Sequence, residues 1–592
     1  MSHSFTRQMR RSRDWEQPRY GFTLIELLAV CICLTVTGAS AAPGQVEANM
    51  QSLHFGDGSN WRCLGGDWAG DGATFVPPAA PKVRNTHSRA FYVGQGYADV
   101  TVEFEYLAGA WEDGSGTAGL ILRAQDGGHY YVVHFPWVGQ ALRSKNFWAG
   151  LGKVSGDGYV RYVDFRVVPG LPAELDRWYR VKVEAIGGRI RVWVDGRLAV
   201  DVTDDTYASG FVGLSGFGSY GFRNLRVSGT AQSPVAWDET VQIAKPMIEL
   251  PVSSNPMTTG CVAPNGDILI GAGRTLLRST DKGRTWVKET LPDHVYPLTD
   301  YGATLMRTRG GRLIVHGLIG GSISQDDPRA HGFYLAESFD SGKTWTEMTL
   351  RPLLDDFDWP SNLSKGRLYA YGPLTETEDG TLIRFLYSGI ESDGPYDKLQ
   401  SWGASMNKAV AFRSTDGGLS WSGPIEIDRP VAFRVKRGSI PGALDFTETT
   451  GVAIGNTVMT VIRPVYSPWM WQCWSYDSGA TWEAAARTTF PGYAQSIIRT
   501  ASGVILCGHR FPGYSINISR DGGMNWDEGT LIDYPAWAMG CMIEVEPDVL
   551  FVTYMNSSYG DVAKLQKVEA SPLRAQRIRI TANGIVPLSS DE

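Results

Sequence analysis

A glutamate and an arginine in the stretch FTETTGVAIGNTVMTVIRP have the types and spacing of a polar site. Glu448 lies ahead of one apolar segment and Arg463 ends the next, with a Gly455-Asn456 turn between them. A hairpin brings both residues to the same end. A guanidinium binds a carboxylate through two hydrogen bonds, and a carboxylate exchanges protons with hydroxyls or water. We therefore predict a site with Glu448 as acid or base; the alternative is a salt bridge that only orders loops.

Other candidates occupy equivalent positions at the ends of further predicted strands. Asp300 precedes its segment as Glu448 does, so the two carboxylates could act as acid and base. Arg510 ends its segment as Arg463 does. Two free guanidinium groups would favour an anionic sugar, whereas neutralisation of each by a carboxylate would favour a neutral one. The candidates for stacking and hydrogen bonding to a sugar, each with core packing as its alternative, are Tyr369, Tyr371, Tyr387, Tyr493, His509 and Trp537.

A repeated pattern indicates the elements that must position these residues. RSTDKGRTW at 278–286 returns as ESFDSGKTW, RSTDGGLSW, WSYDSGATW and ISRDGGMNW. In each copy the Asp and Gly suit a hairpin turn, and the Trp would begin the next strand and fill a core. Six further segments, such as TGCVAPNGDILIGA, are typical of two strands about a turn. We therefore predict a six-bladed propeller with its site over the central channel, closed by TVQIAKPMIEL or QRIRIT.

The segment before the repeats predicts a β-sandwich. ADVTVEFEYL and WYRVKVEAIGGRIRVWVDGRLAVDV alternate apolar and polar residues, and the second contains hairpin turns at Gly-Gly and Asp-Gly. The order of these strands, ending in GFVGLSGFGSYGFRNLRVSG, resembles the concanavalin A-like jelly rolls (LamG and keto-disaccharide hydrolase-like) of secreted carbohydrate enzymes. Trp111, Trp137 and Trp148 could stack on sugars or fill the core.

The repeats make residues 240–585 similar to the sialidase superfamily, whose propellers carry Asp-box (BNR) repeats. This resemblance implies that the repeat Asp residues are frame, and that Glu448 and Arg463 match the family's glutamate and one of its three carboxylate-binding arginines. The family's first arginine is missing from NPMT at 255–258, its acid Asp from GAGRTLL and its nucleophilic Tyr from PAWAMG. Hydrolysis of ordinary sialosides is therefore not expected. The resemblance implies a glycoside hydrolase for another glycan; the alternative is a non-catalytic carbohydrate-binding or cell-surface protein.

The N-terminal residues predict export. Five arginines precede the apolar run GFTLIELLAVCICLTVTG. GFTLIE resembles the type IV prepilin leader, which is cut after the glycine, whereas ASA at 39–41 suits signal peptidase; retention as a membrane anchor is a third alternative. The protein is expected to be secreted, periplasmic or attached to the cell surface. The expected order is a leader (1–49), a jelly roll (50–230), a linker or closing strand (231–250) and the propeller (251–592).

Composition agrees with an all-β protein that has a neutral or small partner. The 69 Gly and 31 Pro favour short strands and turns. The formal net charge of -7 argues against nucleic acid, which requires a basic surface. The seven Cys show no metal-ligand spacing, so no metal or cofactor is expected, and the five outside the leader are expected to be buried thiols.

Overall fold

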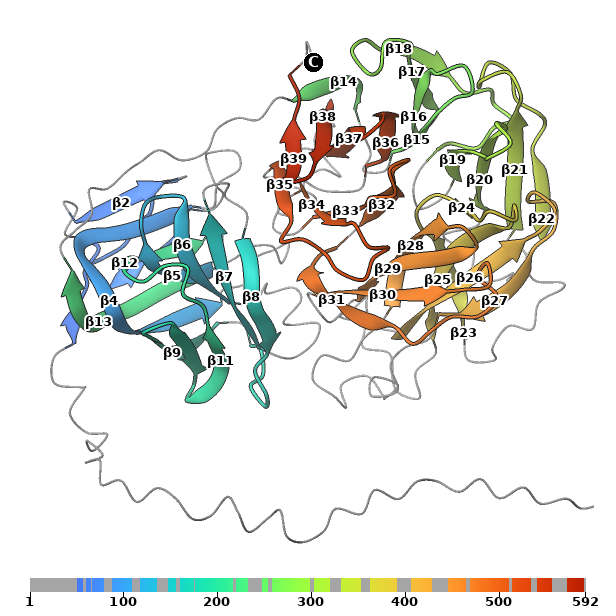
Figure 1. Ribbon diagram of the computed structural model, residues 1–592. Helices are drawn as coiled ribbons and strands as arrows, with labels where there is room; N and C mark the ends of the chain where they lie inside the picture. Colours follow the sequence, from blue (N-terminus) through green and yellow to red (C-terminus); the bar gives the residue numbers. More distant parts are fainter. Residues whose placement is uncertain are drawn as a thin grey trace, which may run out of the picture. The chain divides into compact units, whose positions relative to one another are not determined.

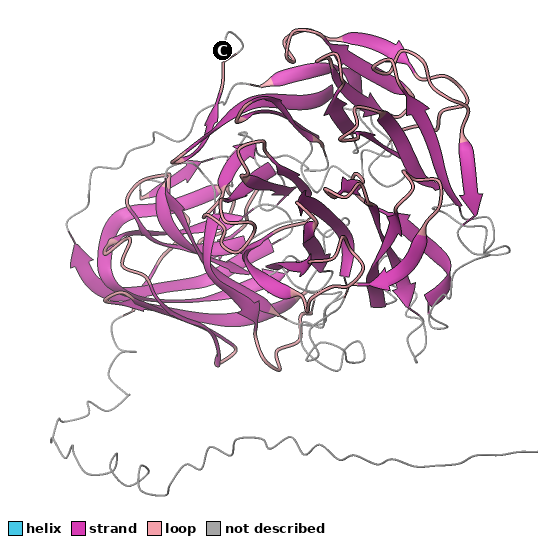
Figure 2. Cartoon of the chain, turned by 45° about the vertical axis from the view of Figure 1, so that its right-hand side comes forward, coloured by secondary structure: helices cyan, strands magenta, loops and turns pink. Residues whose placement is uncertain are grey.

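The protein is all-β in the part of the chain that the structure describes. The computed structural model describes residues 50–56, 60–64, 66–78, 88–108, 118–135, 147–155, 160–174, 176–216, 220–232, 247–253, 258–298, 303–319, 332–352, 363–390, 406–427, 446–464, 469–493, 495–510, 514–533, 540–555 and 572–589. Every regular element within these ranges is a strand (Figure 2). The predicted fold class is thus confirmed.

The first thirteen strands form one sheet that folds into a concanavalin A-like sandwich. Their order is β11-β10-β9-β4-β12-β5-β6-β7-β8, while β13 pairs with β1, β3 and β4, and β2 pairs with β4. The strands are β1 (Gln51–Ser52), β2 (Trp61–Leu64), β3 (Thr74–Phe75), β4 (Arg89–Ala108), β5 (Ala118–Ala124), β6 (His129–Phe135), β7 (Trp148–Ser155), β8 (Val160–Val167), β9 (Arg177–Ile186), β10 (Arg189–Val194), β11 (Arg197–Thr203), β12 (Gly210–Gly216) and β13 (Tyr220–Gln232).

The long strand β4 holds the sandwich together. Its first residues pair with β2 and β12, and its last residues pair with β9 and β13. Along its second half, Val100, Val102, Phe104 and Tyr106 alternate with polar residues and lie in the main core. This period-two pattern is what a strand with one buried face requires. The predicted Asp-Gly turn is also present between β10 and β11, where Asp195 and Gly196 both have positive φ.

The remaining strands form the six blades of a propeller (Figure 1). Blades one to three contain β15 (Thr259–Val262), β16 (Ile268–Ala272), β17 (Thr275–Ser279) and β18 (Val287–Thr290); β19 (Ala303–Arg307), β20 (Leu313–Ile319), β21 (Gly332–Ser338) and β22 (Thr349–Pro352); and β23 (Leu363–Ala370), β24 (Thr375–Glu376), β25 (Leu382–Ile390), β26 (Met406–Ser414) and β27 (Ser422–Glu426). Blades four and five contain β28 (Phe446–Ile454), β29 (Thr457–Pro464), β30 (Trp469–Ser475) and β31 (Ala486–Pro491); and β32 (Ser496–Arg499), β33 (Ile505–Arg510), β34 (Tyr514–Ser519) and β35 (Thr530–Asp533).

Blade six closes the ring with strands from both ends of the propeller segment. It contains β36 (Met542–Glu546), β37 (Val549–Met555), β38 (Pro572–Thr581) and β39 (Gly584–Pro587), together with β14 (Ile248–Ser253). β14 precedes blade one in the chain but pairs with β38, which contains QRIRIT. The strand β36 also contacts β15 of blade one. Closure therefore uses both segments that the sequence analysis named, as far as they are described.

The five repeated turns form a hydrogen-bonded frame within their blades. In the turn of blade two, Ser338 donates to Asp340 Oδ1 and accepts a hydrogen bond from the Gly342 amide. The Asp340 carboxylate also accepts hydrogen bonds from the Thr344 amide and hydroxyl. Equivalent bonds to the Asp occur in the other four turns. Both oxygens of the carboxylate thus accept hydrogen bonds from within the turn, as a structural role requires.

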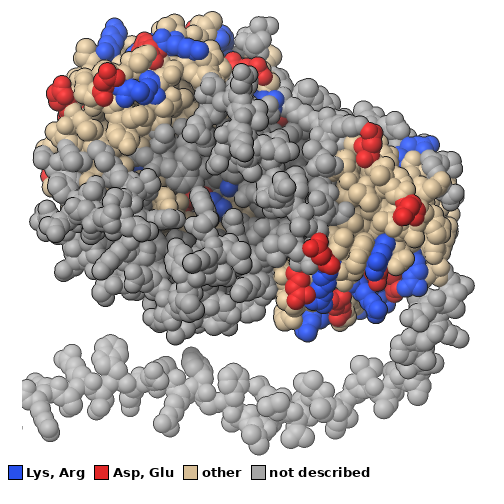
Figure 3. Space-filling view, turned by 180° about the vertical axis from the view of Figure 1, so that it is seen from behind, with Lys and Arg blue, Asp and Glu red and all other residues tan. Residues whose placement is uncertain are grey.

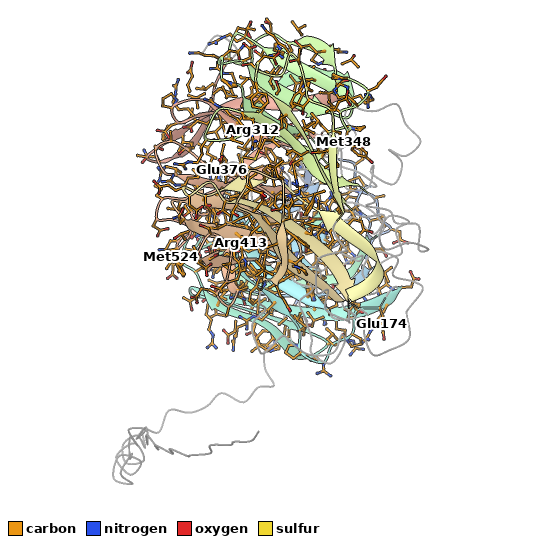
Figure 4. The ribbon with its side chains drawn as sticks, turned by 90° about the vertical axis from the view of Figure 1, so that its right-hand side faces the viewer. Glu174, Arg312, Met348, Glu376, Arg413 and Met524 are labelled. Carbon is orange, nitrogen blue, oxygen red and sulfur yellow. The ribbon has the colours of Figure 1, made fainter. Side chains whose placement is uncertain are left out.

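The variable positions of these turns point to solvent. Phe339, Leu419, Tyr476 and Met524 are between 50% and 73% exposed, so they contribute nothing to a core. Figure 4 shows Met524 toward the same side of the propeller as Glu376 and Arg413, at the ends of strands in blade three. The turns therefore lie on one face of the propeller, whereas Glu448 and Arg463 lie at the opposite ends of their strands.

Replacement of Asp340 with alanine is expected to lower the free energy of unfolding by about 1 kcal/mol, the usual effect of losing a carboxylate that caps backbone amides. Hydrogen bonds from Thr344 lower the pKa of Asp340 to about 2. Because its folded-state pKa is depressed, its contribution is full above pH ~4 and is lost as pH falls toward 2. Denaturant unfolding at pH 7 and pH 3 tests this; equal differences between wild type and variant at both pH values would contradict it.

Candidate functional site

The candidate site is centred on an ion pair in blade four. Glu448 lies at the start of β28, where the register with β29 shifts between Thr447 and Thr450. Glu448 has φ 31°, in the left-handed region that a non-glycine residue rarely adopts. Its Oε1 accepts a 2.5 Å hydrogen bond from Arg463 Nη1 at the end of β29, and both residues are buried. The hairpin thus brings the two residues together as the sequence predicts.

Tyrosines from blade three lie beside this ion pair. Tyr369 and Tyr387 pair across β23 and β25, and their rings stack with centroids 5.1 Å apart. Burial raises the pKa of Tyr387 well above its ordinary value, and the nearby negative charge of Glu448 raises it further, while Arg463 lowers it. Tyr387 is therefore a neutral phenol at physiological pH. This places Tyr387 next to the predicted acid or base, with Tyr369 stacked on its ring.

Blade five supplies the other side of the site. The Arg463 guanidinium lies 5.2 Å from the ring centroid of Tyr493, within the range of a cation–π contact. The backbone amide of Arg510 donates to the Tyr493 carbonyl oxygen at 3.0 Å. Tyr371 of blade three reaches blade five and donates its hydroxyl hydrogen to the Gln495 carbonyl oxygen at 2.8 Å. Residues from three blades therefore lie around Glu448 and Arg463, and Arg510 is joined to Tyr493 through its backbone amide.

His509 is not brought into this group, although the sequence suggested it as a binding residue. Successive side chains of a strand point to opposite faces of the sheet, so His509 lies on the face of β33 opposite to that of Arg510. Its Nε2 donates to Asn517 Oδ1 at 2.8 Å, and its ring stacks on Phe490. Burial lowers the pKa of His509 to about 4, so the imidazole is neutral at physiological pH. His509 thus packs in the core, which is the alternative to sugar binding that the sequence left open.

Several predicted residues lie outside the described part of the chain. These are Asp300 and Trp537 in the propeller, and Trp111 and Trp137 in the sandwich. Trp148 is described: it is buried, and it packs edge to face against Phe165. Trp148 is thus a packing residue in the structure.

Sequence reasoning missed one residue that touches Glu448 directly. The Gln495 side chain is buried and donates hydrogen bonds to the carbonyl oxygens of Glu448 and Val461. Gln495 stands directly before the innermost strand of blade five, near the position that Glu448 has in blade four. Its position before the innermost strand of a blade is a sequence signal for such a residue, but an uncharged amide does not by itself indicate acid or base chemistry.

A second charged pair joins blades five and six. Arg574 Nη1 lies 3.4 Å from Oδ2 of the buried Asp533. Beside it, the rings of Tyr514 and Tyr554 stack at 4.9 Å. These residues come from different blades, so their meeting could not be read from hairpin spacing. Figure 3 shows a hollow in the surface with charged side chains of both signs inside it.

The described residues provide no metal centre. No group of three or more His, Cys, Asp and Glu among them is arranged to hold a metal ion. The five described cysteines are free thiols: Cys473 and Cys507 are buried, whereas Cys63 is exposed. The expectation of buried thiols is therefore wrong for Cys63, and Cys261 and Cys541 are only partly buried. None of the described segments is a helix long and apolar enough to span a membrane, and the apolar run at 21–38 lies outside them.

The fold defines a class: an all-β protein with a concanavalin A-like sandwich and a propeller of six antiparallel blades. Residues 54–228 match the family model of the 3-keto-alpha-glucoside-1,2-lyase-like domain, which confirms the expected relationship of the sandwich. No curated protein matches the chain.

Solved structures similar to this chain include sialidases and a carbohydrate-binding module. A Hadza microbial sialidase is 14% identical, with 85% of this chain and 98% of that chain covered and a TM-score of 0.41. A leech intramolecular trans-sialidase is 13% identical, with 82% and 94% covered and a TM-score of 0.39. The CBM66 module of Bacillus subtilis is 21% identical, with 28% and 96% covered and a TM-score of 0.23. These likenesses are distant, and the strand order above defines the fold.

Proposed function

We propose that the protein is an exported glycoside hydrolase that acts on a neutral glycan, with Glu448 as its acid or base. The observation that supports this most is the buried Glu448–Arg463 pair, in which Glu448 has a left-handed backbone conformation and which lies beside the aromatic side chains of Tyr387 and Tyr493. Strained backbone at a polar site is typical of functional residues. The ion pair exists only while Glu448 is ionised, so the arrangement favours Glu448 as a general base or nucleophile toward water or a sugar hydroxyl.

The pairing of Arg463 with Glu448 favours a neutral sugar beside this pair. Arg463 is already paired with Glu448, so its guanidinium does not present an uncompensated charge to a ligand carboxylate. Tyr369, which is half-buried and stacks on the buried Tyr387, supplies a ring of the kind that packs against the CH-rich faces of sugars. The family matched by the sandwich is named for a keto-glucoside, which is also a neutral sugar. In this proposal the sandwich binds glycan while the propeller carries the reaction.

A non-catalytic glycan-binding or cell-surface protein is the second candidate. It is favoured by the complete burial of Glu448, since a residue that is 0% exposed must gain access to substrate before it can react. Export rests on the basic and apolar N-terminal residues and leads to a secreted, periplasmic or surface location, with the apolar run as a cleaved leader or a membrane anchor.

Assays of the purified protein on paired aryl glycosides, each neutral sugar matched with its uronic acid, test the proposal. We expect turnover of at least one neutral glycoside, at a kcat/KM at least tenfold above that of its anionic partner. Binding of neutral oligosaccharides without turnover of any glycoside would support the second candidate. The absence of both turnover and binding would contradict both candidate functions. A preference for the anionic member of each pair would refute the neutral specificity.

A further inference from the structure

Gln495 connects three blades at the candidate site. Its side-chain Nε2 donates to the carbonyl oxygen of Glu448 on β28 and, at 3.1 Å, to that of Val461 on β29. Its own backbone carbonyl oxygen accepts the hydrogen bond from the Tyr371 hydroxyl of blade three. Two carbonyl acceptors fix the orientation of the amide, because exchange of its nitrogen and oxygen would place three oxygens together.

The position of this amide coincides with the irregularity in blade four. The register between β28 and β29 shifts between Thr447 and Thr450, so the backbone of Glu448 leaves the regular ladder there. The carbonyl oxygens that Gln495 binds lie on the two strands of this hairpin, at Glu448 itself and at Val461, which faces Thr450. The amide thus joins both strands at the place where Glu448 adopts φ 31°.

The amide of Gln495 is used only through its donor end. Gln495 Oε1 is buried and has no hydrogen-bond partner within the described residues, and the same is true of Oε1 of the buried Gln576. A buried acceptor without a partner is unfavourable in both residues. What distinguishes Gln495 is where its donors go, to the backbone of Glu448 and of the facing strand.

We propose that Gln495 is a positioning residue for Glu448: its amide holds the Glu448 backbone in the conformation that directs the carboxylate to Arg463. The effect on catalysis that follows from this inference rests on the proposed function. The conformation of a non-glycine residue at positive φ persists only where surrounding contacts impose it. With the amide removed, the Glu448 backbone is expected to relax toward an ordinary strand conformation, which turns successive side chains to opposite faces and takes the carboxylate away from Arg463.

The test replaces Gln495 with methionine, which keeps a similar length without donors. Gln576→Met is the matched control, because Gln576 is equally buried and donates to the Ile532 carbonyl oxygen and the Tyr554 hydroxyl, away from Glu448. On the neutral glycoside that the wild type hydrolyses, we expect kcat to fall about 100-fold for Gln495→Met with KM unchanged, since misplacement of a reacting group by about 1 Å has an effect of this size. For Gln576→Met we expect an unchanged kcat.

Crystal structures of both variants give a readout that is independent of activity. We expect Glu448 to leave positive φ and to separate from Arg463 in Gln495→Met only. If Glu448 keeps its conformation and pairing, and kcat equals that of the control, the inference is overturned. If Gln495→Met does not fold, Tyr371→Phe replaces it, with an expected tenfold loss of kcat; no loss there also overturns the inference. A wild type without turnover refutes the proposed function, while the crystal structures still decide the role of Gln495.

Discussion

Replacement of Glu448 with glutamine is expected to reduce kcat by about 10²- to 10⁴-fold, the range that general acid–base catalysis contributes. The glutamine is isosteric and its Oε1 can still accept the hydrogen bond from Arg463, so the fold and the binding of ligand are expected to persist, although the buried guanidinium loses its counter-ion and the free energy of unfolding is expected to fall. The result therefore separates chemistry from binding. It is measured as kcat and KM on the neutral glycoside with the highest wild-type turnover, together with ligand binding by calorimetry.

Glu337→Gln provides the control for this prediction. Glu337 also pairs with an arginine, Arg312, at 2.5 Å, but it lies at the end of blade two that carries the repeated turn. Glu337→Gln is expected to leave kcat within about twofold of the wild-type value. The reason is that Glu337 lies at the end of its strand next to the repeated turn, whereas Glu448 lies at the opposite end of the blade strands. A Glu448→Gln enzyme as active as this control would remove Glu448 from the reaction and leave glycan binding as the function.

Replacement of Arg463 with methionine is expected to lower the free energy of unfolding by about 3–5 kcal/mol, the usual effect of removing one partner of a buried ion pair. Glu448 is 0% exposed, so the variant would leave a carboxylate in a site where water cannot replace the guanidinium. Adding Glu448→Gln to Arg463→Met is expected to recover much of this loss, because the second change removes the buried charge. Denaturant unfolding of the two single variants and the double variant measures the coupling.

Arg312→Met is the matched variant for Arg463→Met. The Arg312–Glu337 pair is partly exposed, with side-chain exposures of 27% and 21%, so water can solvate the remaining carboxylate. Its loss is expected to cost about 1 kcal/mol or less. Equal losses for Arg312→Met and Arg463→Met, or no recovery in the double variant, would show that the blade-four pair is not held as a buried charge pair and that its contacts only order the strands.

The blades and the blade-four pair could be predicted because their determinants are local. A strand with one buried face must alternate, a tight turn requires residues such as Asp and Gly, and hairpin partners are close in sequence. Glu448 and Arg463 are partners of this kind, since Thr447 and Arg463 face each other in the hairpin. The carboxylates of the repeated turns are equally local, as each of their hydrogen bonds reaches only two to four residues along the chain.

The sequence by itself determined the strand content, the order of sandwich and propeller, the number of blades and the pairing of Glu448 with Arg463. Tertiary structure decided what surrounds this pair. Packing of blade three and blade five against blade four placed Tyr387 and Gln495 beside Glu448, although 61 and 47 residues separate them from it in the numbering. It also turned His509 toward Asn517 and Phe490. Such contacts depend on how neighbouring blades pack, and residue spacing within a single blade carries no information about them.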